Sequence, residues 1–302
     1  MWLVYTPIYF FIYTLISYFL FHDNQILIIF AQILRKMTVR DWIHQREIQG
    51  LATFTTEDVV EAFPNLTPQL IRNNLYRASK AGIITQPYRG FYIIIPPHYA
   101  AKGVVPPVYY IDQLMAFLQK PYYIGLLSAA ELLGAAHQRP QYFCVMTTLP
   151  QLHVQKQTTL DWTYRASINS ALLQTRNSET GTVYFSSPEL TALDLVQYDQ
   201  RIGGLSRAAT IIEELSEQTS WNGAAQNGLI AQSTLATVQR LGYILEHVLQ
   251  NQEQADALYA ELRQVAPKLN RFPLSSRKST YGAEIDKHWS ILINTEIEID
   301  EL

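Results

Sequence analysis

Residues 67–97 constrain the fold of this chain more than any other stretch, because they predict a helix followed by a tight hairpin. Thr67 can cap the first free amides of the helix, and Pro68 suits its first position because a proline has no N–H to leave unpaired there. Gly82 supplies a stop for the helix. Two β-type runs then meet at Arg89, which predicts a hairpin with an arginine at its tip. A helix followed by a basic hairpin is typical of the recognition helix and wing of a winged helix-turn-helix.

The predicted recognition helix has an apolar side and a polar side. The apolar residues at helical spacing are Leu70, Ile71, Leu75, Ala78 and Ala81. The polar residues are Gln69, Arg72, Asn73, Tyr76, Arg77 and Lys80. No carboxylate occurs among them, and their side chains are the donors and acceptors that contact phosphates and base edges. We therefore expect this side of the helix, together with Arg89, to bind DNA.

The distribution of charge favours a DNA-facing patch in the same part of the chain. The whole chain has a formal net charge of -3, but residues 62–111 contain no Asp or Glu. Local positive charge on an otherwise slightly acidic protein is typical of a nucleic-acid interface. A solvated helix face would also be polar, but the missing acids and the adjoining hairpin favour DNA binding. We expect Lys80 and Arg89 to contact phosphates, and the major groove to receive Gln69, Arg72, Asn73 and Arg77.

Two further helices are predicted upstream of Thr67. Residues 38–50 carry an apolar stripe and end at a glycine, and Thr55 with Asp58 forms a capping-box pattern that starts the next helix. Helix, short helix, tight turn and recognition helix is the order of a helix-turn-helix. We therefore predict a winged helix-turn-helix DNA-binding domain over residues 37–97.

The first residues of the chain are apolar and have several interpretations. Residues 2–21 carry no charge and are long enough to cross a bilayer. A signal peptide fits poorly, because no positive side chain precedes the run and no small-residue cleavage site follows it. We expect residues 1–36 to be an extension upstream of a natural start at Met37, with a membrane anchor as the alternative. The single cysteine, Cys144, excludes a disulfide within the chain and fits a cytoplasmic protein, membrane-anchored only if residues 2–21 are expressed as a span.

The rest of the chain predicts a second domain. Paired prolines bracket residues 98–107, which we expect to be a linker. Residues 109–118 and 122–136 show the pattern of amphipathic helices, and β-type runs and further helices follow them. The predicted fold class is therefore mixed α and β, with the winged helix-turn-helix followed by an α/β domain over residues 108–302.

A basic cluster lies near the end of this second domain. Its members surround Pro273 and are Lys268, Arg271, Arg277 and Lys278. A charge cluster of this kind is most often a solvated surface, and an independent nucleic-acid-facing or toxin-facing surface is the functional alternative.

The sequence also resembles a known family. After the helix-turn-helix and hairpin come residues 122–147, YYIGLLSAAELLGAAHQRPQYFCVMT, then residues 186–198, SSPELTALDLVQY, and a terminal tryptophan strand at residues 289–294. This arrangement resembles the AbiEi family of antitoxins from type IV toxin–antitoxin, abortive-infection systems. The segment at 122–147 is the most specific part. The resemblance covers nearly everything after Met37, whereas the apolar extension has no place in the family pattern.

The resemblance implies a function with two parts. The N-terminal winged helix of such a protein represses the promoter of its own operon by binding inverted repeats, which implies a dimer on the operator DNA. The C-terminal antitoxin domain opposes a cognate AbiEii toxin of the nucleotidyltransferase type, without forming a stable complex with it. The antitoxin surface expected from the residues is the basic cluster of Lys268, Arg271, Arg277 and Lys278.

The sequence shows no constellation that predicts an enzyme. No histidine pair has the i, i+4 spacing of a helical metal site, and neither GxGxxG, GxxxxGK[ST] nor GxSxG occurs. Glu131 and His137 flank a predicted helix end, where structural roles are the simplest explanation. We therefore expect no catalytic residues, no metal and no cofactor. The alternatives are a membrane-anchored winged-helix regulator and a nucleic-acid enzyme built on Asp161 and positioned by the winged helix.

Overall fold

The computed structural model of the chain describes residues 37–100, 104–135, 140–152 and 159–299. The predicted extension at 1–36 lies outside these ranges, as does His137. None of the helices within the described ranges is both long enough and apolar enough to cross a bilayer.

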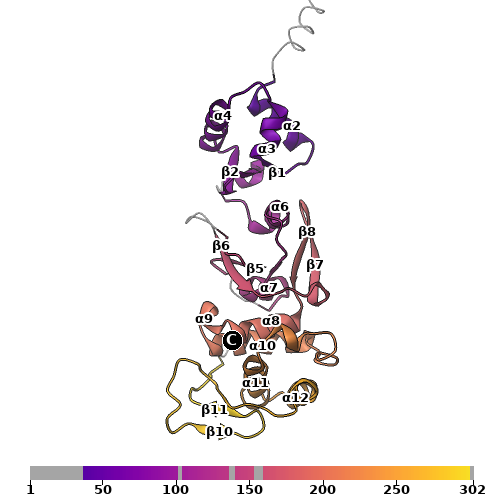
Figure 1. Cartoon of the computed structure of the whole chain (residues 1–302), viewed down its shortest axis with the longest axis vertical. Coiled ribbons are helices and arrows are strands. Elements are labelled where there is room, and N and C mark those ends of the chain that lie inside the picture. The colour runs from indigo at the N-terminus through magenta and orange to yellow at the C-terminus, as the bar shows by residue number, and fades with distance from the viewer. Residues whose placement is uncertain (1–36, 101–103, 136–139, 153–158, 300–302) are drawn as a thin grey trace, which may run out of the picture.

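The molecule is built in tiers along its longest axis (Figure 1). A small helical unit with its own sheet lies at one end, a larger sheet lies in the middle, and helices with a small terminal sheet form the other end. This architecture confirms the predicted mixed α and β fold class.

The first tier has the element order of a winged helix-turn-helix. Its elements are α2 (Val39–Ile48), β1 (Thr53–Thr55), α3 (Thr56–Ala62), α4 (Pro68–Lys80), β2 (Ile84–Tyr88) and β3 (Phe91–Ile94). The strands form an antiparallel sheet in the order β1-β3-β2. Capping boxes at Thr38 and Thr55 start α2 and α3, and the Thr67 hydroxyl caps α4. Ile43, Phe54, Val59, Ile71, Leu75 and Ile84 fill its core.

The apolar side of α4 is narrower than the sequence predicts. Ile71, Leu75 and Ala78 are buried, but Leu70 is 48% exposed and Ala81 is exposed at the C-cap. Because α4 packs chiefly against α2, α3 and β2, a stripe of one residue per turn is enough to cover its inner side. Leu70 therefore belongs to the outer surface.

The segment predicted as a linker is partly helical. It contains α5 (Pro97–Ala100) and leads through η1 (Pro107–Tyr109) into α6 (Ile111–Phe117). Phe91 and Ile93 of the wing strand share one hydrophobic cluster with Ile111 and Leu114 of α6. The first tier therefore packs on the second, in addition to being joined to it by the chain.

The middle tier is a mixed five-stranded sheet in the order β6-β5-β4-β8-β7. Its strands are β4 (Tyr122–Ile124), β5 (Phe143–Thr148), β6 (Leu160–Arg165), β7 (Leu173–Ser178) and β8 (Gly181–Ser186). Strands β5 and β6 are parallel, as are β4 and β8, and the other pairs are antiparallel. The sequence predicts one helix over 122–136, whereas the chain forms β4 first and then α7 (Leu126–Leu132). Pairing of β4 with both β5 and β8 decides this, because a short apolar run has no strong preference of its own.

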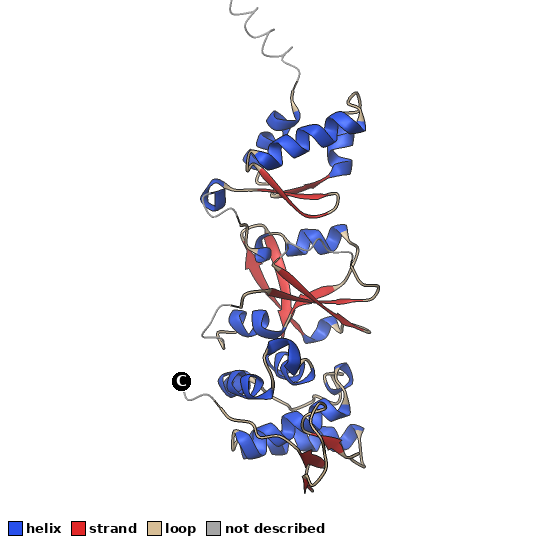
Figure 2. Cartoon of the chain, turned by 90° about the vertical axis from the view of Figure 1, so that its left-hand side faces the viewer, coloured by secondary structure: helices blue, strands red, loops and turns tan. Residues whose placement is uncertain are grey.

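Helices cover the side of the five-stranded sheet that faces away from the first tier, and they form the last tier (Figure 2). They are α8 (Pro188–Gln197), α9 (Asp199–Ile202), α10 (Leu205–Leu215), α11 (Leu235–Tyr243) and α12 (Gln252–Val265), with η3 (Ser216–Gln218) and η4 (Ile230–Gln232) between them and a π-helix η5 (Ile244–Val248). The strands β9 (Phe272–Pro273), β10 (Glu284–Asp286) and β11 (Ile291–Ile293) form a small sheet in the order β10-β11-β9. Trp289, just before β11, is fully buried in the largest hydrophobic cluster of the chain.

Candidate nucleic-acid interface

The outer side of α4 carries the residues predicted to bind DNA. Burial of Ile71, Leu75 and Ala78 turns the opposite side of the helix to solvent. The exposed polar residues on it are Gln69, Arg72, Asn73, Tyr76, Arg77 and Lys80. They follow one another at helical spacing, so they form one continuous stripe.

Side chains in the first turns of α4 are hydrogen-bonded to one another. The Nη2 atom of Arg72 donates to Oε1 of Gln69 at 2.7 Å, and Nε2 of Gln69 donates to Oδ1 of Asn73 at 3.1 Å. Asn74, on the flank of the stripe, donates to the backbone carbonyl of Leu70 at 2.8 Å. The guanidinium of Arg72 keeps other N–H donors for a ligand, because only part of its fork is used here. These contacts therefore order the side chains at this end of the helix while Arg72 keeps donors for a ligand.

The last turns of α4 carry a different kind of contact. The ammonium of Lys80 lies 5.7 Å from the centre of the Tyr76 ring, and Tyr76 is 64% exposed. A cation held over an exposed ring stays accessible to a phosphate while its side chain loses part of its freedom. Arg77 is exposed beside this pair.

The wing is short and its tip is braced. Arg89 and Gly90 form the tight turn between β2 and β3, and Gly90 has a φ of 83°, in the region that favours glycine. The backbone amide of Thr56 donates to the Gly90 carbonyl at 2.9 Å, and the ring of Phe117 packs against the wing from the other side. Arg89 itself is exposed. Its contact with DNA remains a prediction.

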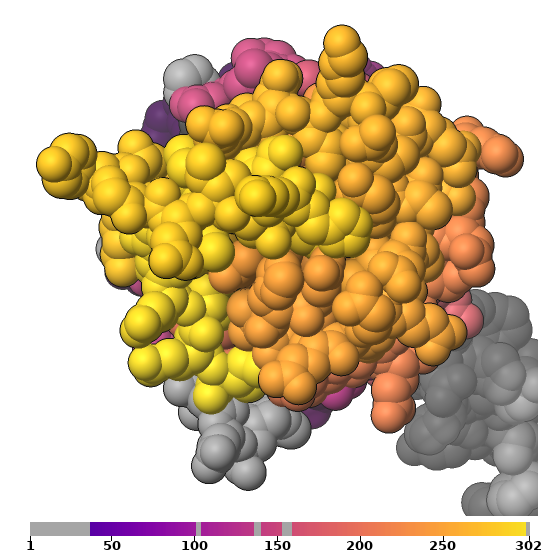
Figure 3. All heavy atoms as spheres, turned by 90° about the horizontal axis from the view of Figure 1, so that it is seen from below, coloured from indigo at the N-terminus to yellow at the C-terminus, as the bar shows by residue number. Residues whose placement is uncertain are grey.

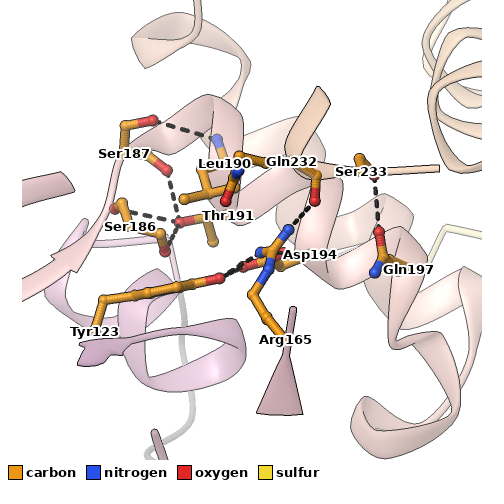
Figure 4. A network of polar contacts seen from close by, with 10 residues as sticks. All are labelled: Tyr123, Arg165, Ser186, Ser187, Leu190, Thr191, Asp194, Gln197, Gln232 and Ser233. Carbon is orange, nitrogen blue, oxygen red and sulfur yellow. Dashed lines mark hydrogen bonds and ion pairs between the residues drawn. The ribbon is translucent and has the colours of Figure 1, made fainter. Parts of the chain in front are cut away.

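A buried polar network lies in the second half of the molecule (Figure 4). Arg165, at the end of β6, donates from Nη1 to Oδ1 of Asp194 and to the hydroxyl of Tyr123, each at 2.5 Å. The Tyr123 hydroxyl donates to Oδ2 of Asp194 at 2.6 Å, and Nη2 of Arg165 donates to the carbonyl of Gln232. The network therefore joins β4 and β6 of the sheet to α8 and η4.

The charges of this network compensate one another. Asp194 and Arg165 are 1% and 6% exposed. Burial raises the pKa of the Asp194 carboxyl, and the adjacent guanidinium opposes this rise. Burial would lower the pKa of Arg165, but the Asp194 carboxylate together with the hydroxyls of Tyr123 and Tyr198 more than offsets this effect, so the guanidinium stays charged. A buried pair with its hydrogen bonds satisfied fixes the position of α8 on the sheet.

Hydroxyl groups fix the start of α8 beside this network. The Ser187 hydroxyl accepts from the amide of Leu190 at 3.3 Å, and the hydroxyls of Ser186 and Thr191 lie 2.6 Å apart. Glu189, in the first turn, accepts from the amide of Ser220 at 2.9 Å. These contacts cap α8 and give the carboxylate of Glu189 a structural role.

The elements of this network belong to a known domain family. Residues 123–247 match the family model described as the AbiEi antitoxin C-terminal domain. This part of the chain is an AbiEi antitoxin C-terminal domain. It runs from β4 to η5, and Tyr123, Arg165 and Asp194 all lie within it.

The fold of the whole chain has a counterpart among solved structures. The crystal structure of the Rv2827c protein from Mycobacterium tuberculosis superposes with a TM-score of 0.60 over 85% of this chain and 92% of that one. The identity is 14%, so the likeness shows a shared fold. No curated protein matches the chain in sequence.

Asp161, the carboxylate on which an enzyme was considered, is paired with an arginine. Asp161 accepts from Nη2 of Arg201 at 2.5 Å in an ion pair. The thiol of Cys144 is buried, and burial raises its pKa, as expected for an inert cysteine. Across the described part of the chain, no group of three or more His, Cys, Asp and Glu side chains is placed to hold a metal ion.

The predicted basic cluster lies at the far end of the molecule, outside the AbiEi domain. Lys268 and Arg271 precede β9, and Arg277 and Lys278 follow it. All are exposed. Seen from below, this end is covered by orange and yellow atoms of the C-terminal part (Figure 3). Arg277 donates to Gln200, and Lys278 donates to the Thr295 hydroxyl at 2.7 Å, so each is held while remaining accessible.

Sequence reasoning missed the buried network and the pairing of side chains on α4. Tyr123, Arg165 and Asp194 lie far apart in the chain, and no local pattern links them. For α4 a signal was present, because Gln69 has Arg72 and Asn73 at the i+3 and i+4 positions. Polar side chains at that spacing meet on one side of a helix.

Proposed function

We propose that this protein represses its own promoter through the winged helix and opposes an AbiEii-type nucleotidyltransferase toxin through the C-terminal region over residues 108–302, which contains the AbiEi domain. The observation that carries the proposal is the exposed, acid-free polar side of α4, joined in one chain to an AbiEi domain. The operator is an inverted repeat bound by a dimer of the protein. The toxin is a functional partner that forms no stable complex with the antitoxin.

The DNA-binding part is tested by a gel-shift assay on the DNA upstream of the protein's own coding sequence. The wild-type chain binds this DNA, and Arg72→Ala and Asn73→Ala each lose affinity and sequence selectivity, because a well-placed base contact discriminates by roughly 1–3 kcal/mol. The matched control is Arg263→Ala, which removes an exposed arginine from α12 and leaves binding unchanged. If Arg72→Ala and Asn73→Ala both bound the operator with wild-type affinity and selectivity, α4 would not be the recognition helix.

The antitoxin part is tested by co-expression with the nucleotidyltransferase encoded beside the gene. The full chain is expected to restore growth, with the basic cluster around β9 as the surface required for rescue. Co-purification of the two proteins at equal amounts would contradict an indirect mode of action.

A further inference from the structure

We propose that Gln69 is a positioning residue, which holds Arg72 and Asn73 in the orientation in which they read neighbouring base pairs. The inference rests on the proposed DNA-binding function and concerns how the sequence is read. The inference also specifies the bases that are read: Arg72 contacts a guanine, and Asn73 contacts an adenine in the neighbouring base pair.

Both ends of the Gln69 amide are engaged. Its oxygen accepts from Arg72 at 2.7 Å, and its nitrogen donates to Asn73 at 3.1 Å. A glutamine that reads adenine needs its oxygen and its nitrogen together, to accept from N6 and donate to N7. The Gln69 amide keeps one lone pair and one N–H, but these two partners fix the amide plane, so turning the amide edge onto an adenine would cost at least one of the two contacts. Gln69 is therefore poorly placed to read a base and well placed to order its neighbours.

Arg72 and Asn73 keep the groups that base reading requires. Nη2 of Arg72 has a second hydrogen, and Nη1 and Nε carry donors as well, enough for the paired bonds to guanine O6 and N7. Asn73 keeps its amide nitrogen as a donor, and its oxygen has a second lone pair for adenine N6. Because Arg72 and Asn73 are adjacent on an exposed helix side, the bases that they reach are neighbours.

Ordering these side chains on DNA costs conformational entropy. Arginine, glutamine and asparagine all lose side-chain freedom when they bind a base, and this loss reduces affinity. The hydrogen bonds to Gln69 restrict Arg72 and Asn73 before DNA arrives. A simpler explanation is that the i, i+3 and i, i+4 pairs only stabilise the helix. The two explanations differ in what loss of Gln69 does to selectivity.

The experiment selects binding sites from a randomised duplex library with the full-length protein and its variants. Arg72→Ala and Asn73→Ala identify the base pair that each residue reads, by the position at which preference is lost. Gln69→Ala is expected to relax those same two positions and no third one, with affinity for the best wild-type site reduced about fivefold. Thermal unfolding of Gln69→Ala checks that the exposed substitution leaves the fold intact.

A double-mutant comparison on that site gives the second readout. Gln69→Ala combined with Arg72→Ala is expected to bind within about twofold of Arg72→Ala alone, because the positioning effect needs Arg72 to be present. The matched control combines Gln69→Ala with Arg77→Ala, an exposed arginine outside the paired set, and these effects should multiply.

The outcomes separate this inference from the proposed function. Relaxation of a third base pair by Gln69→Ala, or multiplying effects with Arg72→Ala, would show that Gln69 reads a base itself. A shift in unfolding temperature with unchanged selectivity would leave only the helix-stabilising role and overturn the inference. If the wild-type protein selected no sequence at all, the proposed DNA-binding function itself would be wrong.

Discussion

The ring of Phe117 on α6 lies 5.6 Å from the ring of Phe91 on β3. The centre of the Phe117 ring also lies 6.4 Å from the centre of the Tyr88 ring, and a Cβ added to Gly90 would lie 3.7 Å from the Phe117 ring. One side chain therefore contacts both strands of the wing and the turn between them. The wing is held between α3 and α6, so its position depends on residues outside the helix-turn-helix.

Phe117→Ala is expected to weaken both the fold and DNA binding. Phe117 is half-buried, so the loss should be about 1–3 kcal/mol, below that of a fully buried phenylalanine. DNA affinity should fall because the turn that carries Arg89 is no longer braced. Urea unfolding and the gel-shift assay measure the two effects. Phe117→Leu, which keeps an apolar side chain, should recover most of both, and wild-type binding by Phe117→Ala would contradict the coupling.

Lys80→Ala and Arg89→Ala are expected to weaken DNA binding equally on all sequences. Both cations are exposed, at the end of α4 and at the wing tip. Each phosphate contact that is lost should reduce the slope of log affinity against log salt by about one unit. Titrations at several salt concentrations measure the slope on the operator and on an unrelated duplex. A loss of selectivity with an unchanged slope would place these residues at base edges instead.

Gly242→Ala is expected to disrupt the packing of the last tier. A Cβ at this position would lie 2.1 Å from the Trp289 ring, closer than real contacts allow, and both residues are buried. Overpacking of a filled core costs about 1–3 kcal/mol and more where the neighbour is rigid. Thermal unfolding measures the loss. The double variant Gly242→Ala with Trp289→Phe should be less destabilised than the sum of its parts, and additivity would contradict this contact as the cause.

The contacts of Glu246 predict a dependence of stability on acid. Its carboxylate accepts from Trp289 Nε1 and contacts Nδ1 of His288, both at 2.7 Å. Burial alone would raise the pKa of Glu246, but these hydrogen bonds and the nearby histidines lower it below its ordinary 4.5. A depressed folded-state pKa gives stability that is present above about pH 4.5 and lost as the pH falls through the folded value.

Glu246→Gln is the variant that tests this dependence. It keeps an oxygen acceptor for the tryptophan but removes the titrating group. Urea unfolding midpoints, followed from neutral pH to well below the ordinary value, should fall less steeply for the variant than for the wild type. Parallel curves for the two proteins would show that the acid sensitivity arises elsewhere.

The winged helix was predictable because its signals are local. The caps at Thr38, Thr55 and Thr67 and the stop at Gly82 each lie within a few residues of the element that they end or begin. Strand β4 was not predictable, because Tyr122–Ile124 becomes a strand only through pairing with distant segments. The buried network of Tyr123, Arg165 and Asp194 was not predictable either, because its members come together only in the folded chain.

The basic cluster was predicted as a set, and the structure shows how its members are held. Lys268 and Arg271 come from one side of β9, and Arg277 and Lys278 come from the other, so a β-strand pair keeps the two halves together. That arrangement follows from the pairing of β9 with β11, which no local pattern indicated. The antitoxin role of these residues remains a prediction.

Replacing Lys268, Arg271, Arg277 and Lys278 together with Ala is expected to abolish antitoxicity and to leave repression intact. All are exposed and lie at the opposite end of the molecule from α4, so the winged helix should be unaffected. Exposed side chains contribute little to stability, so the free energy of unfolding should change by less than about 1 kcal/mol. Growth rescue during co-expression with the proposed AbiEii-type toxin measures antitoxicity, and a promoter fusion measures repression. Arg72→Ala is the reciprocal control, which should lose repression and keep rescue.

Full rescue by the four-alanine variant would exclude this surface as the antitoxin site. Rescue by a fragment over residues 37–102 would instead place antitoxicity in transcription and remove the need for a separate surface.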